Sequence, residues 1–194
     1  MLKLSDNPPL TPPEFASVTQ MPGRWWVAHT KARFEKAFAF DMLERGIAYF
    51  LPLTLRVRIS GGRKRHVMHP VFPSYVFVNG DDEARFNALS TGRLCQMIEV
   101  KDQLTFTREL ASIEKALKGA ARLDPYPHAV TGMRCRVIAG PFMGIEGTVV
   151  NRSGLARIVL EVGILGQGAS MEIDADLLES CEQLPRTGQM LARA

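Results

Sequence analysis

The residues best suited to chemistry lie in the stretch 61–78, which reads GGRKRHVMHPVFPSYVFV. His66 and His69 stand three positions apart on an expected strand, where alternating side chains point to opposite faces. The two rings therefore cannot share one metal ion. Three consecutive cations favour the binding of a polyanion, because the sequence has no acidic residue between Glu44 and Asp81 to balance them. The alternative is a solvated hairpin that its charges keep soluble.

No catalytic set accompanies this basic stretch. The sequence lacks a P-loop, a GxSxG motif and an HExxH motif. Its three cysteines, Cys95, Cys135 and Cys181, form no metal-binding or disulfide pattern. We therefore expect no enzymatic activity, no metal and no cofactor. So few cysteines also indicate a reducing compartment, and we predict a cytoplasmic protein.

Short strands and helices must position the basic stretch. The composition predicts strands over 24–30, 47–53, 55–60 and 94–100, and helices over 31–46, 81–92 and 107–120. We expect Thr107 to cap the last helix and Gly61-Gly62 to form a hairpin turn. Residues 55–60 alternate strictly, which places Arg56 and Arg58 on one face of a strand. Strands joined by hairpins predict an α+β fold with an antiparallel sheet and helices packed against it.

Changes in composition divide the chain into parts. Four prolines among the first thirteen residues predict a disordered leader. Two prolines in the polar stretch after the last expected helix predict a linker. Short β-like runs separated by glycines then predict a small all-β barrel. The predicted parts are a leader over 1–22, an α+β domain over 23–119, a linker over 120–131, a barrel over 132–184 and a tail over 185–194.

Two stretches of the chain resemble a known family. RWWVAHTKARFEKAFAFDMLERGIAYFLP followed by FPSYVFV is similar to the N-terminal domain of NusG-type transcription elongation factors. GMRCRVIAGPFMGIEGTVV resembles the KOW motif that begins the C-terminal barrel of that family. The resemblance covers residues 24–184. It implies a four-stranded antiparallel sheet flanked by helices (the NGN domain), followed by a five-stranded SH3-like KOW barrel.

The resemblance implies a monomeric elongation or antitermination factor that is not membrane-bound. Such a factor binds the clamp helices of RNA polymerase, suppresses pausing and raises processivity. The implied polymerase contacts, or residues that shape that surface, are Phe34, Phe38, Phe72, Pro73 and Tyr75. The alternative for Phe72 and Tyr75 is a place in the core.

The resemblance also implies two further binding surfaces. The hairpin cations would approach the non-template DNA strand and hold its phosphates; they are Arg56, Arg58, Arg63, Lys64 and Arg65. Apolar loop residues of the barrel would meet the termination factor Rho or a small-subunit ribosomal protein; they are Phe142, Ile145, Ile164 and Leu165.

The sequence departs from the family pattern at three places, one of which is residues 91–94, Thr-Gly-Arg-Leu, where the family usually has Thr-Pro-Gly-Val. Ser74 stands where the family usually has glycine, and residues 164–167 read Ile-Leu-Gly-Gln where it usually has Ile-Phe-Gly-Arg. The first domain is therefore more similar to specialised paralogues, of which RfaH is an example. A different hypothesis is an RNA- or ribosome-binding KOW protein without polymerase affinity.

Overall fold

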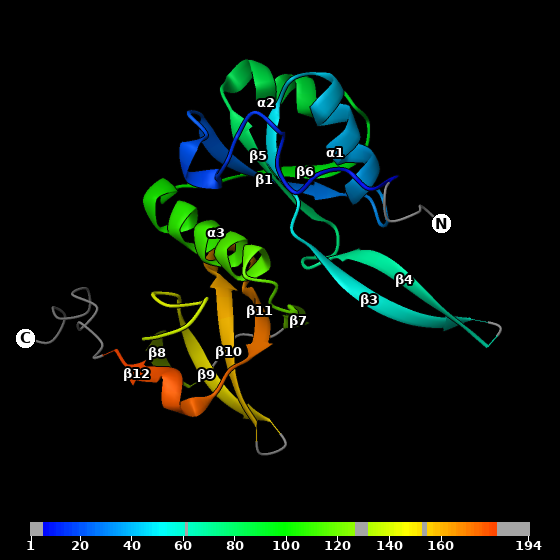
Figure 1. Cartoon of the computed structure of the whole chain (residues 1–194). Coiled ribbons are helices and arrows are strands. Elements are labelled where there is room, and N and C mark those ends of the chain that lie inside the picture. Colours follow the sequence, from blue (N-terminus) through cyan, green and yellow to red (C-terminus); the bar gives the residue numbers. More distant parts are fainter. Residues whose placement is uncertain (1–5, 61, 127–131, 153–154, 182–194) are drawn as a thin grey trace, which may run out of the picture.

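The computed structural model describes residues 6–60, 62–126, 132–152 and 155–181 (Figure 1). Its N-terminal sheet has four strands in the order β2-β5-β1-β6, and each neighbouring pair is antiparallel. The strands are β1 (Arg24–Thr30), β2 (Ala48–Phe50), β5 (Tyr75–Gly80) and β6 (Leu94–Glu99). The four-stranded antiparallel sheet that the family resemblance implies is thereby confirmed.

Helices cover both faces of the N-terminal sheet. On one face, Trp26 of β1 packs in a core with Phe38 of α1 (Glu35–Glu44); α2 (Asp82–Leu89) also contributes to this core. On the other face, Trp25 packs in a second core with Phe106 of α3 (Gln103–Lys118). Burial of both faces explains why β1 is apolar at successive positions instead of alternating with polar residues. None of the helices in the described part of the chain is long and apolar enough to cross a membrane.

Helix α3 begins four residues before the position expected from the sequence. Asp102 caps it, because its carboxylate accepts the backbone N–H of Thr105 at 3.0 Å. Thr107, the expected cap, lies inside the helix, one turn after its start, and donates its hydroxyl to the carbonyl of Gln103 at 2.7 Å. The side chain of Gln103 also bonds the backbone N–H and carbonyl of Trp25 at 2.7 and 3.0 Å. This contact with β1 fixes the start of the helix and has no local sequence signal.

The predicted disorder of the leader is wrong for residues 6–22. Val18, in the short helical turn η2 (Val18–Gln20), is fully buried and belongs to the same core as α3. The buried carboxylate of Glu114 accepts the Ser17 hydroxyl at 2.6 Å and the Val18 N–H at 3.3 Å. Further along, the Leu51 N–H donates to the carbonyl of Leu10 at 2.8 Å. Tertiary contacts therefore order a segment whose proline content suggested disorder.

A two-stranded hairpin projects from the N-terminal sheet (Figure 1). It consists of β3 (Leu53–Ser60) and β4 (Arg63–Pro70). The expected turn at Gly61-Gly62 lies partly outside the described residues. Pro73 lies in the turn between β4 and β5, where the Tyr75 N–H donates to the carbonyl of Phe72 at 3.2 Å. A proline outside any strand removes no ladder hydrogen bond, so Pro73 does not weaken the sheet.

The C-terminal sheet has six strands in the order β12-β8-β9-β10-β11-β7. Five of them follow the expected linker: β8 (Met133–Val137), β9 (Glu146–Arg152), β10 (Leu155–Val162), β11 (Gln167–Glu172) and β12 (Leu178–Ser180). The sixth, β7 (Asp124–Tyr126), lies within the stretch 120–131 expected to be a linker, and it pairs with β11. The predicted tail over 185–194 lies outside the described residues.

The two sheets meet across α3, which lies between them (Figure 1). A single hydrophobic core contains Phe77 of the N-terminal sheet, Leu110 of α3 and Ile158 of the C-terminal sheet. Helix α3 therefore packs against both sheets.

Candidate functional site

The strand register of the hairpin sorts its charged and apolar residues onto two faces. Residues that pair across β3 and β4 share a face. The positions on one face, which we call the arginine face, include Arg56, Arg58, Arg63 and Arg65. The positions on the opposite, apolar face include Leu55, Val57, Ile59, Lys64, His66 and Met68. The register therefore separates Lys64 from the four arginines with which the sequence grouped it.

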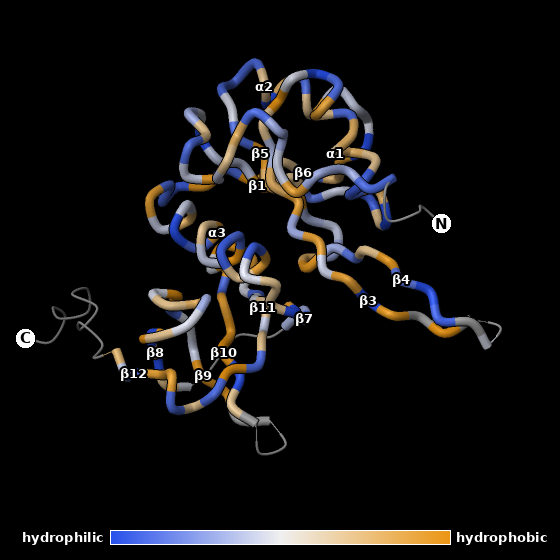
Figure 2. The backbone as a smooth tube through the Cα atoms, in the orientation of Figure 1, coloured by the Kyte–Doolittle hydropathy of each residue, from blue (hydrophilic) through white to orange (hydrophobic). Residues whose placement is uncertain are grey.

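The apolar face of the hairpin is open to solvent. Leu55, Val57 and Ile59 are 45%, 51% and 72% exposed. Figure 2 shows hydrophobic residues of β3 far out along the projecting hairpin. Contiguous exposed apolar residues are typical of a binding surface. The alternation in the sequence identified this face, but its exposure depends on the hairpin standing alone as two strands.

The five expected polymerase contacts divide between surface and core. Phe38 is fully buried and Phe72 is 1% exposed, so both belong to the interior. Phe34 is 40% exposed, and Pro73 is exposed as well. Tyr75 is half-buried and stacks on His29, with ring centroids 5.0 Å apart. Of this set, three residues reach the surface.

The turn that carries Pro73 is anchored to the first residue of α1. Ser74 has a φ of +67°, the left-handed region that favours glycine. Its backbone N–H donates to the carboxylate of Glu35 at 2.7 Å, and Glu35 is only 7% exposed. This geometry gives a physical reason for glycine at this position in the family.

The guanidinium of Arg93 lies over the ring of Phe34, 5.6 Å from its centroid, and also pairs with the carboxylate of Asp41. The hydrogen bond that Arg93 donates to the carboxylate of Asp41 raises the pKa of Arg93 further above its usual range. A fixed cation therefore stands beside the exposed aromatic ring.

The four expected partner-binding residues of the C-terminal sheet lie at its junction with α3. Ile145 is 1% exposed within the shared core, and Leu165 packs against that core. The ring of Phe142 approaches Gly119 so closely that an added Cβ would lie 2.6 Å from it. Ile164, in the turn η3 (Gly163–Leu165), lines a hollow of about 440 Å³ together with residues of α3. Phe142, Ile145 and Leu165 are engaged within the chain itself, whereas Ile164 is 39% exposed.

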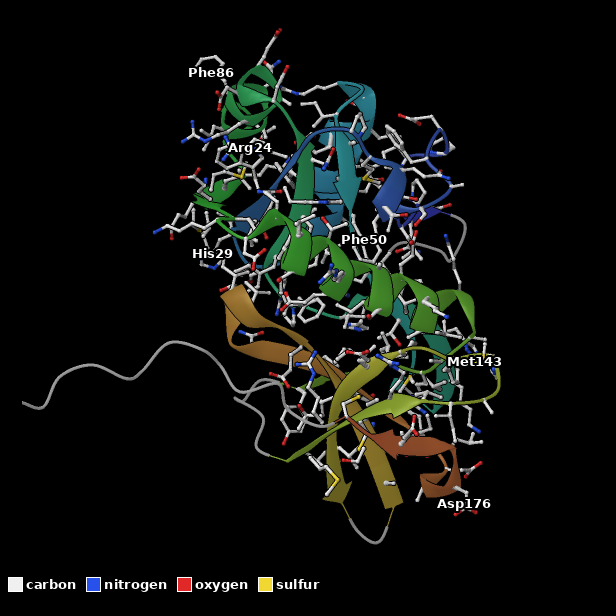
Figure 3. The ribbon with its side chains drawn as sticks, turned by 90° about the vertical axis from the view of Figure 1, so that its left-hand side faces the viewer. Arg24, His29, Phe50, Phe86, Met143 and Asp176 are labelled. Atoms are coloured by element: carbon white, nitrogen blue, oxygen red, sulfur yellow. The ribbon has the colours of Figure 1, made fainter. Side chains whose placement is uncertain are left out.

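Polar contacts also join α3 to the C-terminal sheet. The Nζ of Lys115 donates to the carbonyl of Met143 at 2.5 Å, and Figure 3 shows Met143 beside α3. A carboxylate oxygen of Glu109 accepts the N–H of Gly163 at 3.2 Å. Burial raises the pKa of Glu109, and the bond from Gly163 opposes that rise. Glu109 is therefore a charged group held at a partly buried junction.

Within the described ranges, no group of three or more histidine, cysteine and carboxylate residues could hold a metal ion. The expectation of a protein without a metal or cofactor stays a prediction.

A comparison with models of protein families found a match in the N-terminal half of the chain. Residues 23–116 match the model of the NusG family, described as transcription termination factor nusG. This region, which we call the NusG-family domain, is therefore similar to that family. The NusG-family domain thus comprises the N-terminal sheet and nearly all of α3, and the match indicates no catalytic family.

Other comparisons are weaker. A solved structure described as domain interaction in Thermotoga maritima NusG is 20% identical, with a TM-score of 0.41. The alignment covers 84% of this chain and 99% of that chain. Curated protein sequences gave no match.

Proposed function

We propose that the protein is a transcription elongation or antitermination factor that binds RNA polymerase through its NusG-family domain. The match over residues 23–116 carries this proposal. In this function the domain binds the clamp helices of the polymerase, suppresses pausing and raises processivity. The mechanism requires a binding surface and no reacting group.

The docking surface that we propose centres on Phe34, Pro73 and Tyr75. These residues reach solvent and include two aromatic rings, the side chains that contribute most at protein interfaces. Phe38 and Phe72 act indirectly in this proposal, because their buried rings support α1 and the turn before β5.

A pull-down with core RNA polymerase tests this proposal. We expect the double variant Phe34→Ala/Tyr75→Ala to bind at least about tenfold more weakly than the wild type, because two aromatic anchors are removed. Phe86→Ala is a matched control, since Phe86 is a 70% exposed aromatic residue on α2 that does not belong to the proposed docking surface. Failure of the wild type to bind the polymerase clamp would refute the proposal.

We propose that the C-terminal sheet recruits a second factor, Rho or a small-subunit ribosomal protein, through Phe142, Ile145, Ile164 and Leu165. Since Phe142, Ile145 and Leu165 pack into the core that the sheet shares with α3, recruitment through them requires the sheet to move away from the helix, whereas Ile164 is already 39% exposed.

A second candidate function is RNA or ribosome binding without polymerase affinity. The arginine face of the hairpin favours it, because guanidinium groups bind phosphate oxygens without selecting bases. In the elongation-factor proposal, the same face holds the non-template DNA strand. Tight binding to free RNA that weakens steeply with salt, without polymerase binding, would support this second function.

A further inference from the structure

An ion pair joins the arginine face of the hairpin to the C-terminal sheet. The Nη2 of Arg56 lies 3.6 Å from the Oδ1 of Asp124 on β7. The other oxygen of Asp124 accepts a hydrogen bond of 2.9 Å from the Nη2 of Arg157 on β10. One carboxylate therefore stands between two guanidinium groups that belong to separate parts of the fold.

The ion pair between Arg56 and Asp124 is weak, so another anion can replace Asp124 beside Arg56. At 3.6 Å it is an ion pair without a well-formed hydrogen bond, and the two side chains are 40% and 36% exposed. Exposed pairs of this kind contribute little to stability.

Arg157 is held more firmly. Its side chain is 16% exposed, and it also donates to Glu172 at 3.1 Å and to the Ser170 hydroxyl at 3.1 Å. Arg157 thus keeps its position if Asp124 moves.

There is space for an anion beside this carboxylate. A hollow of about 390 Å³ is lined by Arg122, Asp124, Arg157 and Glu172, among others. Arg122 is exposed and adds a third guanidinium group near Asp124. A phosphodiester carries one negative charge and oxygens that accept paired guanidinium hydrogen bonds, as a carboxylate does.

We propose that Asp124 is an internal competitor for phosphate, and that a nucleic-acid phosphate takes its place between Arg56 and Arg157. The phosphate path then continues from the arginine face onto the C-terminal sheet, past Arg122. This inference rests on the proposed binding of nucleic acid by the hairpin. It assigns to β7 a role that the expected linker did not have.

The full-length Asp124→Asn variant tests the inference. Its affinity for fluorescent single-stranded DNA and RNA of equal length is measured by anisotropy at graded salt. We expect tighter binding by about fivefold, and a salt slope steeper by about 0.7, the value for one further phosphate contact with a single strand. An equal gain on both strands assigns the site to the shared phosphodiester, and a gain on one strand assigns it to that nucleic acid.

Glu172→Gln is the matched control. It removes one negative charge from the same hollow and from the same arginine, Arg157. It leaves the ion pair between Asp124 and Arg56 of the hairpin in place. We expect little change in affinity. Equal gains for Asp124→Asn and Glu172→Gln would overturn the inference, because they would reflect net charge alone.

Two further variants separate the possible causes. Asp124→Glu keeps the carboxylate and should show no gain, which controls for disturbance of β7. Adding Arg56→Ala to Asp124→Asn should abolish the gain, and a gain that persists would refute the inference.

The hairpin proposal is tested separately by Arg65→Ala in the wild type. If Arg65→Ala weakens binding and Asp124→Asn has no effect, the inference fails and the hairpin proposal stands. If neither the wild type nor Asp124→Asn binds either strand, both fail.

Discussion

Ser74, which departs from the family pattern, lowers the stability of the fold through backbone strain. Its φ of +67° places a side chain in a conformation that L-residues other than glycine adopt with strain. The backbone bond from Ser74 to Glu35 holds the turn in this conformation. The surrounding structure, and not the local preference of serine, therefore fixes the turn.

We predict that Ser74→Gly stabilises the protein. Glycine relieves the left-handed strain and keeps the N–H that Glu35 accepts, so the free energy of unfolding should rise by about 0.5–1 kcal/mol. Denaturant unfolding monitored by circular dichroism measures the change. Ser112→Gly, within α3, is the control of opposite sign, with an expected loss of about 0.5 kcal/mol. A loss of stability in Ser74→Gly would show that the serine side chain contributes more than the strain costs.

The sequence marked Ser74 as unusual but could not give its dihedral angle. It also marked Phe34, Phe38, Phe72 and Tyr75 as one set, because they share an aromatic character and a family motif. Which of the rings are buried depends on packing between α1, α3 and the sheet. That packing involves residues far apart in the sequence, so motif position alone did not separate surface from core.

Helix α3 shows how a tertiary contact moves the start of an element. Asp102 supplies the cap, and the bond from Thr105 holds the pKa of the Asp102 carboxyl below its usual range. The lower pKa in the folded protein means that this group stabilises the fold above its unfolded pKa. That contribution is lost as the pH falls through the lowered folded value.

We expect Asp102→Ala to destabilise the protein more than Thr107→Ala does. Asp102→Ala leaves N–H groups of the first turn without their cap, whereas Thr107 bonds a carbonyl that already has a helical partner. Thermal unfolding at neutral and acidic pH measures both variants. The difference in unfolding temperature between Asp102→Ala and the wild type should decrease on acidification. A larger effect of Thr107→Ala would instead support the start of α3 that the sequence predicted.

At the level of elements, residue composition and pattern predicted the strands of the N-terminal sheet and the approximate position of each helix. The errors fell where proline content was the main basis of the expectation. Prolines in the leader suggested disorder, yet Glu114 holds the leader on α3. Prolines after α3 suggested a linker, yet Asp124–Tyr126 pair with β11. In both cases the ordering partner lies more than forty residues away.

At the level of the whole molecule, the two sheets share one hydrophobic core through α3. No local pattern in the sequence predicts this contact, because each half has an apolar face that another partner could cover. The partner-binding residues expected in the C-terminal sheet were identified as apolar loop positions. Phe142, Ile145 and Leu165 now pack into the core that this sheet shares with α3 of the same chain.

We predict that Glu109→Gln strengthens the junction between α3 and the C-terminal sheet at neutral pH. Burial raises the pKa of Glu109 in the folded protein, so the charged form opposes folding. The free energy of unfolding therefore falls as the pH rises from the pKa of the unfolded chain to the raised pKa of the folded protein. Glutamine keeps an oxygen that accepts the Gly163 N–H without the charge.

Denaturant unfolding from neutral to mildly acidic pH measures this effect. The variant should be the more stable at neutral pH, and the difference should shrink as Glu109 in the wild type binds a proton. Glu83→Gln, an exposed position on α2, controls for loss of one negative charge. A difference that does not change with pH would contradict the assignment to Glu109.

The position of α3 between two sheets has a consequence for fragments of this protein. A truncated chain that ends at the last residue of α3 would lose the C-terminal sheet, and the side of α3 that carries Glu109 and Lys115, now bonded to Gly163 and Met143, would become exposed. Such a fragment would expose an apolar strip along the helix and would tend to self-associate. Work on the NusG-family domain alone therefore needs polar replacements on that side of α3, chosen so that the side facing β1 is left unchanged.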